Sequence, residues 1–144
     1  VLILARYQFD FEIMHEKSIQ RTLRKCPETI QIDMLTIHKA KGLGYDEVIL
    51  LNLRKGKYGF PSTVMKVDIE EERRLFYVAL TRTKNHVYLL IPKQNSSIFV
   101  EELLKDQKIV SVLLFCQYYI LYYKFFKKNS SLLEKQKKIL YNVI

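Results

Sequence analysis

The stretch TIHKAKGLGYDEVILLNL, residues 36–53, joins a polar turn to an apolar strand and indicates the fold class. Its second half is a nearly continuous run of β-branched and leucine residues, the pattern of a strand buried on both faces of a parallel sheet. Its first half places a histidine and two lysines before two glycines. A polar turn of this composition raises the question whether it holds phosphate.

Similar strands alternate with helical patterns along the chain. We predict further strands at residues 1–5, 32–37 and 86–92, and helices at residues 11–25, 68–82 and 96–106. Asp68 can cap the second helix, with Glu71 three residues later as in a capping box. The alternation predicts an α/β fold with a parallel sheet flanked by helices. The ligand crevice of such a fold lies at the carboxyl ends of the strands, and both residues 38–45 and Arg82 are plausible crevice positions.

The composition favours a polyanionic partner, but most of the charge lies in the tail. The net charge is +9, from 24 Lys+Arg and 15 Asp+Glu. From Lys124 onward, six lysines oppose one acid, so the tail supplies +5 of this charge. Cys26 and Cys116 suggest neither a zinc site nor a disulfide framework, and a reducing cytoplasm is the expected location. The first ten residues do not resemble a signal peptide; they look like a strand from the interior of a longer chain.

The chain divides into residues 1–106 and an apolar, basic tail at residues 107–144. Residues 109–123 carry no charge and are rich in tyrosine and phenylalanine, but a membrane span needs about 20 apolar residues. A core helix or strand fits this segment better, and residues 131–140 have the pattern of an amphipathic helix. We therefore expect a helical tail.

No nucleotide-binding loop of the P-loop type is present in the sequence. The Walker A pattern G-x-x-x-x-G-K-[ST] provides backbone N–H groups for phosphates, and none of the four glycines fits it. No paired acids end a strand in the manner of a Walker B motif. The chain alone should therefore not bind and hydrolyse ATP, and we predict no metal site within it.

Two long segments resemble motifs of a known family. MLTIHKAKGLGYDEVILLNL resembles motif V of the UvrD/Rep/PcrA-type superfamily 1 DNA helicases, and EEERRLFYVALTRTKNHVYLL resembles their motif VI. VLILARYQFD resembles the strand before motif V, and KYGFPS is similar to the helicase IV-like branch. The resemblance covers about residues 1–102. It implies the C-terminal part of the second of two RecA-like domains of the P-loop NTPase type.

The resemblance also implies roles for individual residues. Arg82 matches the arginine finger that reaches the γ-phosphate of ATP, and Gly42 and Leu43 match positions at the nucleotide cleft. ATP with Mg²⁺ would be held mainly by an upstream P-loop domain. The residues that match DNA-phosphate contacts, on single-stranded or partly duplex DNA, are Thr36, His38, Lys39 and Lys41. The glutamate that the family carries after Gly-Leu is Gly44 here, so its ribose contact is not carried over.

The sequence leaves three functions open. The first is a part of an ATP-dependent DNA helicase or translocase, a type of enzyme found in DNA repair, acting with an upstream half. The second is a non-catalytic nucleic-acid-binding or partner-docking module derived from a helicase. The third, which we rank lowest, is a membrane-peripheral protein that uses the apolar tail.

On the helix at residues 68–82 we expect Tyr77 in the core and Arg73 and Arg74 in a salt-bridged face.

Overall fold

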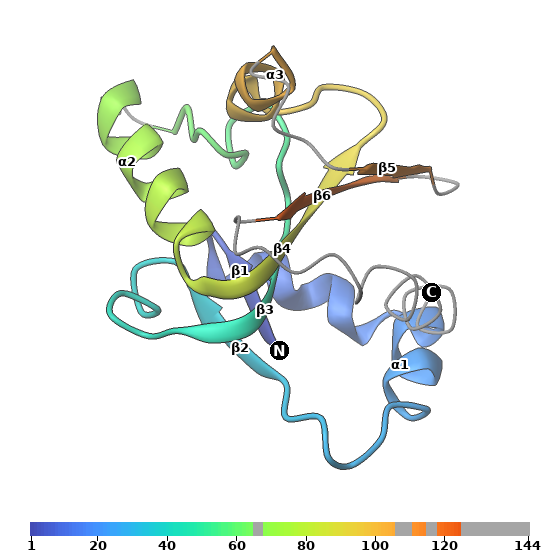
Figure 1. The fold of residues 1–144 in the computed structure, drawn as a ribbon. Helices are drawn as coiled ribbons and strands as arrows, with labels where there is room; N and C mark the ends of the chain where they lie inside the picture. The colour runs from blue at the N-terminus through green and yellow to red at the C-terminus, as the bar shows by residue number, and fades with distance from the viewer. Residues whose placement is uncertain (65–67, 106–110, 115–117, 125–144) are drawn as a thin grey trace.

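The computed structural model describes residues 1–64, 68–105, 111–114 and 118–124 (Figure 1). Within these ranges the strands form one six-stranded sheet in the order β2-β1-β3-β4-β6-β5. The first four strands in this order are parallel, with bounds β1 Leu2–Ala5, β2 Asp33–Thr36, β3 Tyr45–Leu50 and β4 Thr83–Pro92. The predicted α/β fold with a parallel sheet is confirmed, and strands β3 and β4 begin earlier than their apolar runs indicate.

Both faces of the parallel sheet are covered, which explains the continuous apolar runs. Alternate residues of a strand point to opposite faces. In β1, Leu2 and Leu4 pack into one buried cluster, and Ile3 and Ala5 pack into another. Helices α2 (Ile69–Leu80) and α3 (Ile98–Lys105) contribute to the first cluster. The second cluster is covered by the 3₁₀ helix η1 (Gln8–His15) and by α1 (Lys17–Leu23), on the opposite side of the sheet (Figure 1).

The helix predicted at residues 11–25 is two shorter helices. Glu16 has φ −60° and ψ 137°, an extended conformation that ends η1 and begins α1. In η1 the two buried side chains are Phe11 and Met14, three residues apart. This spacing suits a helix of three residues per turn, in which such side chains lie directly above one another.

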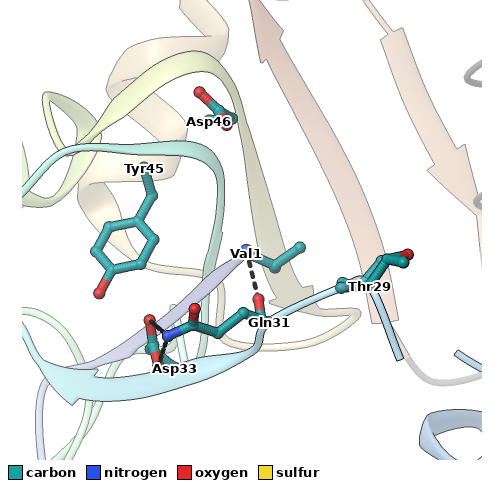
Figure 2. A pocket seen from close by; sticks show the side chains of 7 residues that line it. Val1, Thr29, Gln31, Asp33, Tyr45 and Asp46 are labelled. Atoms are coloured by element: carbon teal, nitrogen blue, oxygen red, sulfur yellow. Dashed lines mark hydrogen bonds between the residues drawn. The ribbon is translucent and has the colours of Figure 1, made fainter. Parts of the chain in front are cut away.

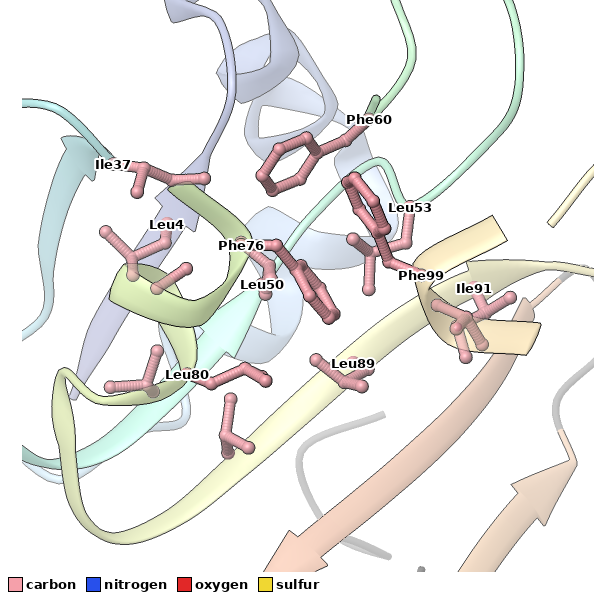
Figure 3. Packing of buried hydrophobic residues seen from close by; sticks show 14 of the residues in the cluster. Leu4, Ile37, Leu50, Leu53, Phe60, Phe76, Leu80, Leu89, Ile91 and Phe99 are labelled. Atoms are coloured by element: carbon pink, nitrogen blue, oxygen red, sulfur yellow. The ribbon is translucent and has the colours of Figure 1, made fainter. Parts of the chain in front are cut away.

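Helix α2 begins at its predicted cap. The carboxylate of Asp68 accepts a hydrogen bond of 2.9 Å from the N–H of Glu70, and three glutamates stand in the first turn at the positive end of the helix dipole. The buried face of α2 consists of Glu72, Phe76, Ala79 and Leu80. Phe76 packs with Phe60 and Phe99 in the core (Figure 3).

The prediction that Tyr77 lies in the core is wrong, because 64% of this residue is exposed. One residue along an α-helix turns the side chain by about 100°, which carries Tyr77 away from the face that contains Phe76. The expected salt-bridged face is present at Arg73, which pairs with Glu70 and Glu102.

The tail differs from the expected helix wherever the structure describes it. Residues Ser111–Leu114 and Tyr118–Lys124 form strands β5 and β6. Strand β6 pairs antiparallel with β4 from Lys124 opposite His86 to Tyr118 opposite Pro92, so this part of the tail extends the sheet. Valine, isoleucine and tyrosine favour strands, and here the edge of β4 supplies a partner. Residues 125–144, including the predicted amphipathic helix, lie outside the described residues.

Candidate functional site

The motif V segment is a crossover between two parallel strands. Thr36 ends β2 beside Ala5 of β1, whereas Tyr45 begins β3. Because the strands are parallel, residues 37–44 must return from the carboxyl edge of the sheet to its amino edge. The N–H of Ala40 donates to the carbonyl of Thr36 at 3.1 Å, as in a helical turn, and Ile37 and Ala40 are fully buried against the sheet.

The polar residues of this turn are directed away from the core. His38, Lys39 and Lys41 are exposed, and Thr36 is half-buried. Among the described residues, none of these three exposed side chains has a hydrogen-bond or ion-pair partner. Because Ile37 and Ala40 are buried against the sheet, the turn presents the imidazole of His38 and the ammonium groups of Lys39 and Lys41 to solvent.

Arg82 lies at the amino ends of the parallel strands, opposite the carboxyl ends of β1 and β2. It directly precedes Thr83, the first residue of β4, and its carbonyl accepts a hydrogen bond of 2.9 Å from the N–H of Tyr45, the first residue of β3. The prediction that Arg82 and residues 38–45 share a crevice at the carboxyl ends is therefore corrected. Of residues 38–45, only the first few lie near the carboxyl end of β2. The last of them lie beside Arg82, at the amino ends of β3 and β4.

Three hydrogen bonds hold the guanidinium of Arg82. Its Nε donates to the carbonyl of Val78 at 2.9 Å, its Nη2 to Oγ1 of Thr81 at 3.1 Å, and its Nη1 to the carbonyl of Leu43 at 3.0 Å. A guanidinium has five N–H donors, so the same orientation leaves donors for an anion. The bond from Nη1 joins the two motifs through Leu43 and Arg82, which are 39 residues apart in the sequence.

The two glycines of the turn differ in what they require. Gly42 has φ +87°, a left-handed conformation that a side chain disfavours. Gly44 has no positive φ, and a Cβ built there would meet only Cε of Lys84, at 3.4 Å. The backbone therefore favours glycine at Gly42, whereas nothing in the fold requires glycine at Gly44.

A buried ion pair behind these motifs was not predicted from the sequence. Glu72, in α2, is 2% exposed, and its Oε1 lies 2.7 Å from Nη2 of Arg6, which follows β1. The N–H of Ser62 also donates to Oε2 of Glu72, at 3.2 Å. The guanidinium of Arg6 is therefore already engaged by a carboxylate.

A pocket at the amino edge contains none of the predicted site residues (Figure 2). Its polar lining includes Asp33, Asp46 and Gln31, whose carbonyl accepts a hydrogen bond from the amino group of Val1 at 2.9 Å. The lining carries two carboxylates against one amino group and is therefore net negative, which disfavours phosphate.

Comparison with known proteins identifies the family that carries these two motifs. Residues 11–94 match the UvrD-like helicase C-terminal domain. The chain belongs to that family. The recognition of a UvrD/Rep/PcrA-type helicase domain from motifs V and VI is thus confirmed, together with the α/β fold expected for it.

Among its relatives, DNA helicase IV of Escherichia coli is 40% identical over 114 residues, which are 70% of this chain and 16% of that protein. A probable DNA helicase II homolog of Mycoplasma capricolum is 33% identical over 100 residues, 67% of this chain and 14% of that protein. The ATP-dependent DNA helicase PcrA of Bacillus subtilis is 38% identical over 66 residues, 45% of this chain and 9% of that protein. No solved structure matches. The chain therefore spans less than a fifth of the length of these relatives.

The described residues contain neither a cluster suited to a metal ion nor a helix that could span a membrane. No group of three or more His, Cys, Asp or Glu side chains in this part of the chain could hold a metal ion. The helices in the same ranges are all too short or too polar to cross a bilayer.

Proposed function

We propose that this chain is the C-terminal part of an ATP-dependent DNA helicase or translocase that completes an ATP site held by an upstream P-loop domain. The observation that carries the proposal is the hydrogen bond from Arg82 to the carbonyl of Leu43. It brings the motif VI arginine to the motif V residues Gly42 and Leu43, the three positions expected at the nucleotide. ATP and Mg²⁺ would be held mainly upstream, because the sequence lacks Walker A and Walker B motifs.

In this function Arg82 acts on the transferring phosphoryl group. Negative charge spreads over the oxygens of that group in the transition state, and a planar guanidinium from the facing domain stabilises it. The bonds to Val78, Thr81 and Leu43 orient the guanidinium before ATP arrives, so little order must be created when the domains close. Loss of the γ-phosphate would remove the anion between the two domains and loosen them.

The exposed end of the crossover supplies DNA contacts in the same proposal. Thr36, His38, Lys39 and Lys41 would contact phosphates of single-stranded or partly duplex DNA without reading sequence. The crossover then has DNA at its beginning and the nucleotide at its end, because it runs from the carboxyl edge of the sheet to Arg82. A cytoplasmic location and a place in DNA repair remain predictions.

A chimera tests the catalytic part of this proposal. The described domain replaces the matching segment of Escherichia coli DNA helicase IV, and ATP hydrolysis is measured with and without single-stranded DNA. We expect DNA-stimulated hydrolysis that falls by about 10³-fold on Arg82→Ala, in line with the contribution of arginine fingers. Arg21→Ala, which removes an exposed arginine of α1, is the matched control and should leave the rate unchanged.

Two results would count against the proposal. Equal hydrolysis by the Arg82→Ala chimera and the parent chimera would show that Arg82 is not the finger. A folded parent chimera that binds DNA without hydrolysing ATP would favour the alternative, a non-catalytic nucleic-acid-binding or partner-docking module derived from a helicase.

A further inference from the structure

Three aromatic rings gather beyond the carboxyl ends of β1 and β3. We call Tyr7, Phe9 and Tyr58 the aromatic platform. The rings of Tyr7 and Phe9 stack with centroids 5.1 Å apart and planes 9° apart, and Tyr58 meets Phe9 edge-on at 5.5 Å. Phe9 is 44% exposed and Tyr58 is 43% exposed. One face of Phe9 is therefore covered by Tyr7 while much of the residue remains open to solvent.

A buried network holds the inner ring of the platform. The hydroxyl of Tyr7 donates to Oγ of Ser62, and the backbone N–H of Ser62 donates to Glu72 at 3.2 Å. Glu72 is in turn paired with Arg6, the neighbour of Tyr7 in the sequence. The position of Tyr7 is thus tied to α2 and to the loop after β3, and not only to the preceding strand β1.

A second set of bonds holds Tyr58 next to the stacked rings. Asp10 accepts a hydrogen bond from the N–H of Tyr7 at 2.9 Å and one from Nδ2 of Asn52 at 2.6 Å. Nδ2 of Asn52 also donates to the carbonyl of Tyr58 at 3.0 Å. Asn52 adopts φ 57°, a left-handed conformation that asparagine tolerates better than most residues. The platform is therefore assembled before any ligand binds.

Two cations lie over rings of the platform. Nζ of Lys57 lies 5.4 Å from the centroid of the Tyr58 ring, and the guanidinium of Arg6 lies 5.0 Å from that of Tyr7. Lys57 and Arg54 are exposed, whereas Arg6 is neutralised by Glu72. The surface thus combines partly exposed aromatic rings with exposed cations, the combination that binds single-stranded nucleic acid with little sequence preference.

We propose that Phe9 and Tyr58 stack against bases of single-stranded DNA. This inference rests on the proposed function, since it extends the DNA contacts beyond the motif V turn. The order of the strands supports it: β2, β1 and β3 are neighbours, and the motif V turn, Phe9 and Tyr58 follow their respective carboxyl ends. A single strand of DNA that runs across these carboxyl ends, with phosphates bound to His38, would reach the aromatic platform next.

Abasic DNA separates base stacking from phosphate binding. The full chain is titrated, by fluorescence anisotropy, with labelled oligothymidylate and with an abasic oligomer of equal phosphate number. We expect oligothymidylate to bind about 10-fold more tightly, within the range of one base–aromatic stack. Phe9→Ala and Tyr58→Ala should lose this preference while still binding the abasic oligomer like the parent chain. Phe9→Tyr keeps a ring and should retain it.

Tyr77→Ala is the matched control, because Tyr77 is an exposed tyrosine that belongs to α2 and not to the platform. It should leave the preference intact, and circular dichroism establishes that each variant is folded. Equal binding of the two oligomers by the parent chain, or an unchanged preference in both Phe9→Ala and Tyr58→Ala, would overturn the inference. ATP hydrolysis by the parent chimera and by its Arg82→Ala variant does not depend on this preference for bases. That experiment therefore tests the proposed function independently of base stacking.

Discussion

Replacing Glu72 by glutamine tests how much the buried ion pair stabilises the domain. Glu72 and Arg6 have side-chain exposures of 2% and 17%, and three nitrogen–oxygen distances of 2.7, 3.1 and 3.2 Å join them. Removing one member of a buried pair costs about 3–5 kcal/mol, because the other charge remains buried without a partner. The glutamine oxygen can keep one hydrogen bond, which recovers about 1 kcal/mol.

We therefore expect Glu72→Gln to lower the free energy of unfolding by about 2–4 kcal/mol. The chain contains no tryptophan, so urea unfolding is followed by far-ultraviolet circular dichroism. With a urea slope of about 1.5 kcal/mol per molar, a loss of about 3 kcal/mol moves the midpoint by about 2 M. Arg6→Met should cost a similar amount. The double variant should cost clearly less than the sum of the two, since no unpaired charge remains.

The pair between Lys55 and Glu101 is the matched control. Its side chains are 48% and 43% exposed, although the distance is also 2.7 Å. An exposed pair contributes about 0–1 kcal/mol, so Glu101→Gln should change stability by no more than that. The same loss in Glu72→Gln and Glu101→Gln would refute the reasoning, because burial would then make no difference to the cost.

Further predictions follow from the backbone and from one carboxyl. Gly42→Ala should destabilise the domain by about 1–2 kcal/mol in urea unfolding, because φ is +87°, whereas Gly44→Ala should stay within about 0.5 kcal/mol. Gly59→Ala should destabilise more than Gly42→Ala, since a Cβ would overlap the carbonyl oxygen of Arg54; equal losses would contradict this steric argument. Burial raises the pKa of Asp10 above 3.8, which an NMR titration can measure. Asp10 therefore contributes to the free energy of unfolding most fully below its pKa in the unfolded chain. This contribution is lost as the pH rises through its pKa in the folded protein, and Asp10→Asn should remove this pH dependence.

Local patterns in the sequence were sufficient for the four parallel strands of the sheet. A strand covered on both faces must be apolar along its length, so residues 47–53 and 86–92 predict strands from composition alone. The starts of β3 and β4 were missed because Tyr45 and Thr83 are polar residues recruited by pairing with each other. In the described part of the tail, residues 111–114 and 118–124, strands stand where a helix was expected, because an uncharged aromatic run fits a helix or a strand until a partner strand is known.

The site required more than local patterns. Motif resemblance located Arg82 and the crossover residues, yet not the edge of the sheet at which each lies. Arg6 and Glu72 are 66 positions apart in the sequence. Glutamate and arginine usually lie on the surface, so nothing in the sequence indicates that this glutamate is buried. The aromatic platform likewise unites Tyr7 and Phe9 with Tyr58, which only the fold brings together.

Two connections carry the chain from the carboxyl edge of the sheet to Arg82, and both pack in the same cluster. The first is the motif V crossover, through Ile37 and Ala40; the second is α2, through Phe76 and Ala79. Glu72 fixes the beginning of α2 to Arg6 after β1, and the carbonyl of Leu43 fixes the end of the crossover to Arg82. A close-packed core moves between discrete arrangements and does not yield gradually. In the proposed helicase, DNA at the carboxyl edge and nucleotide at the amino edge would therefore bias one shared packing, and neither site could change without a cost at the other.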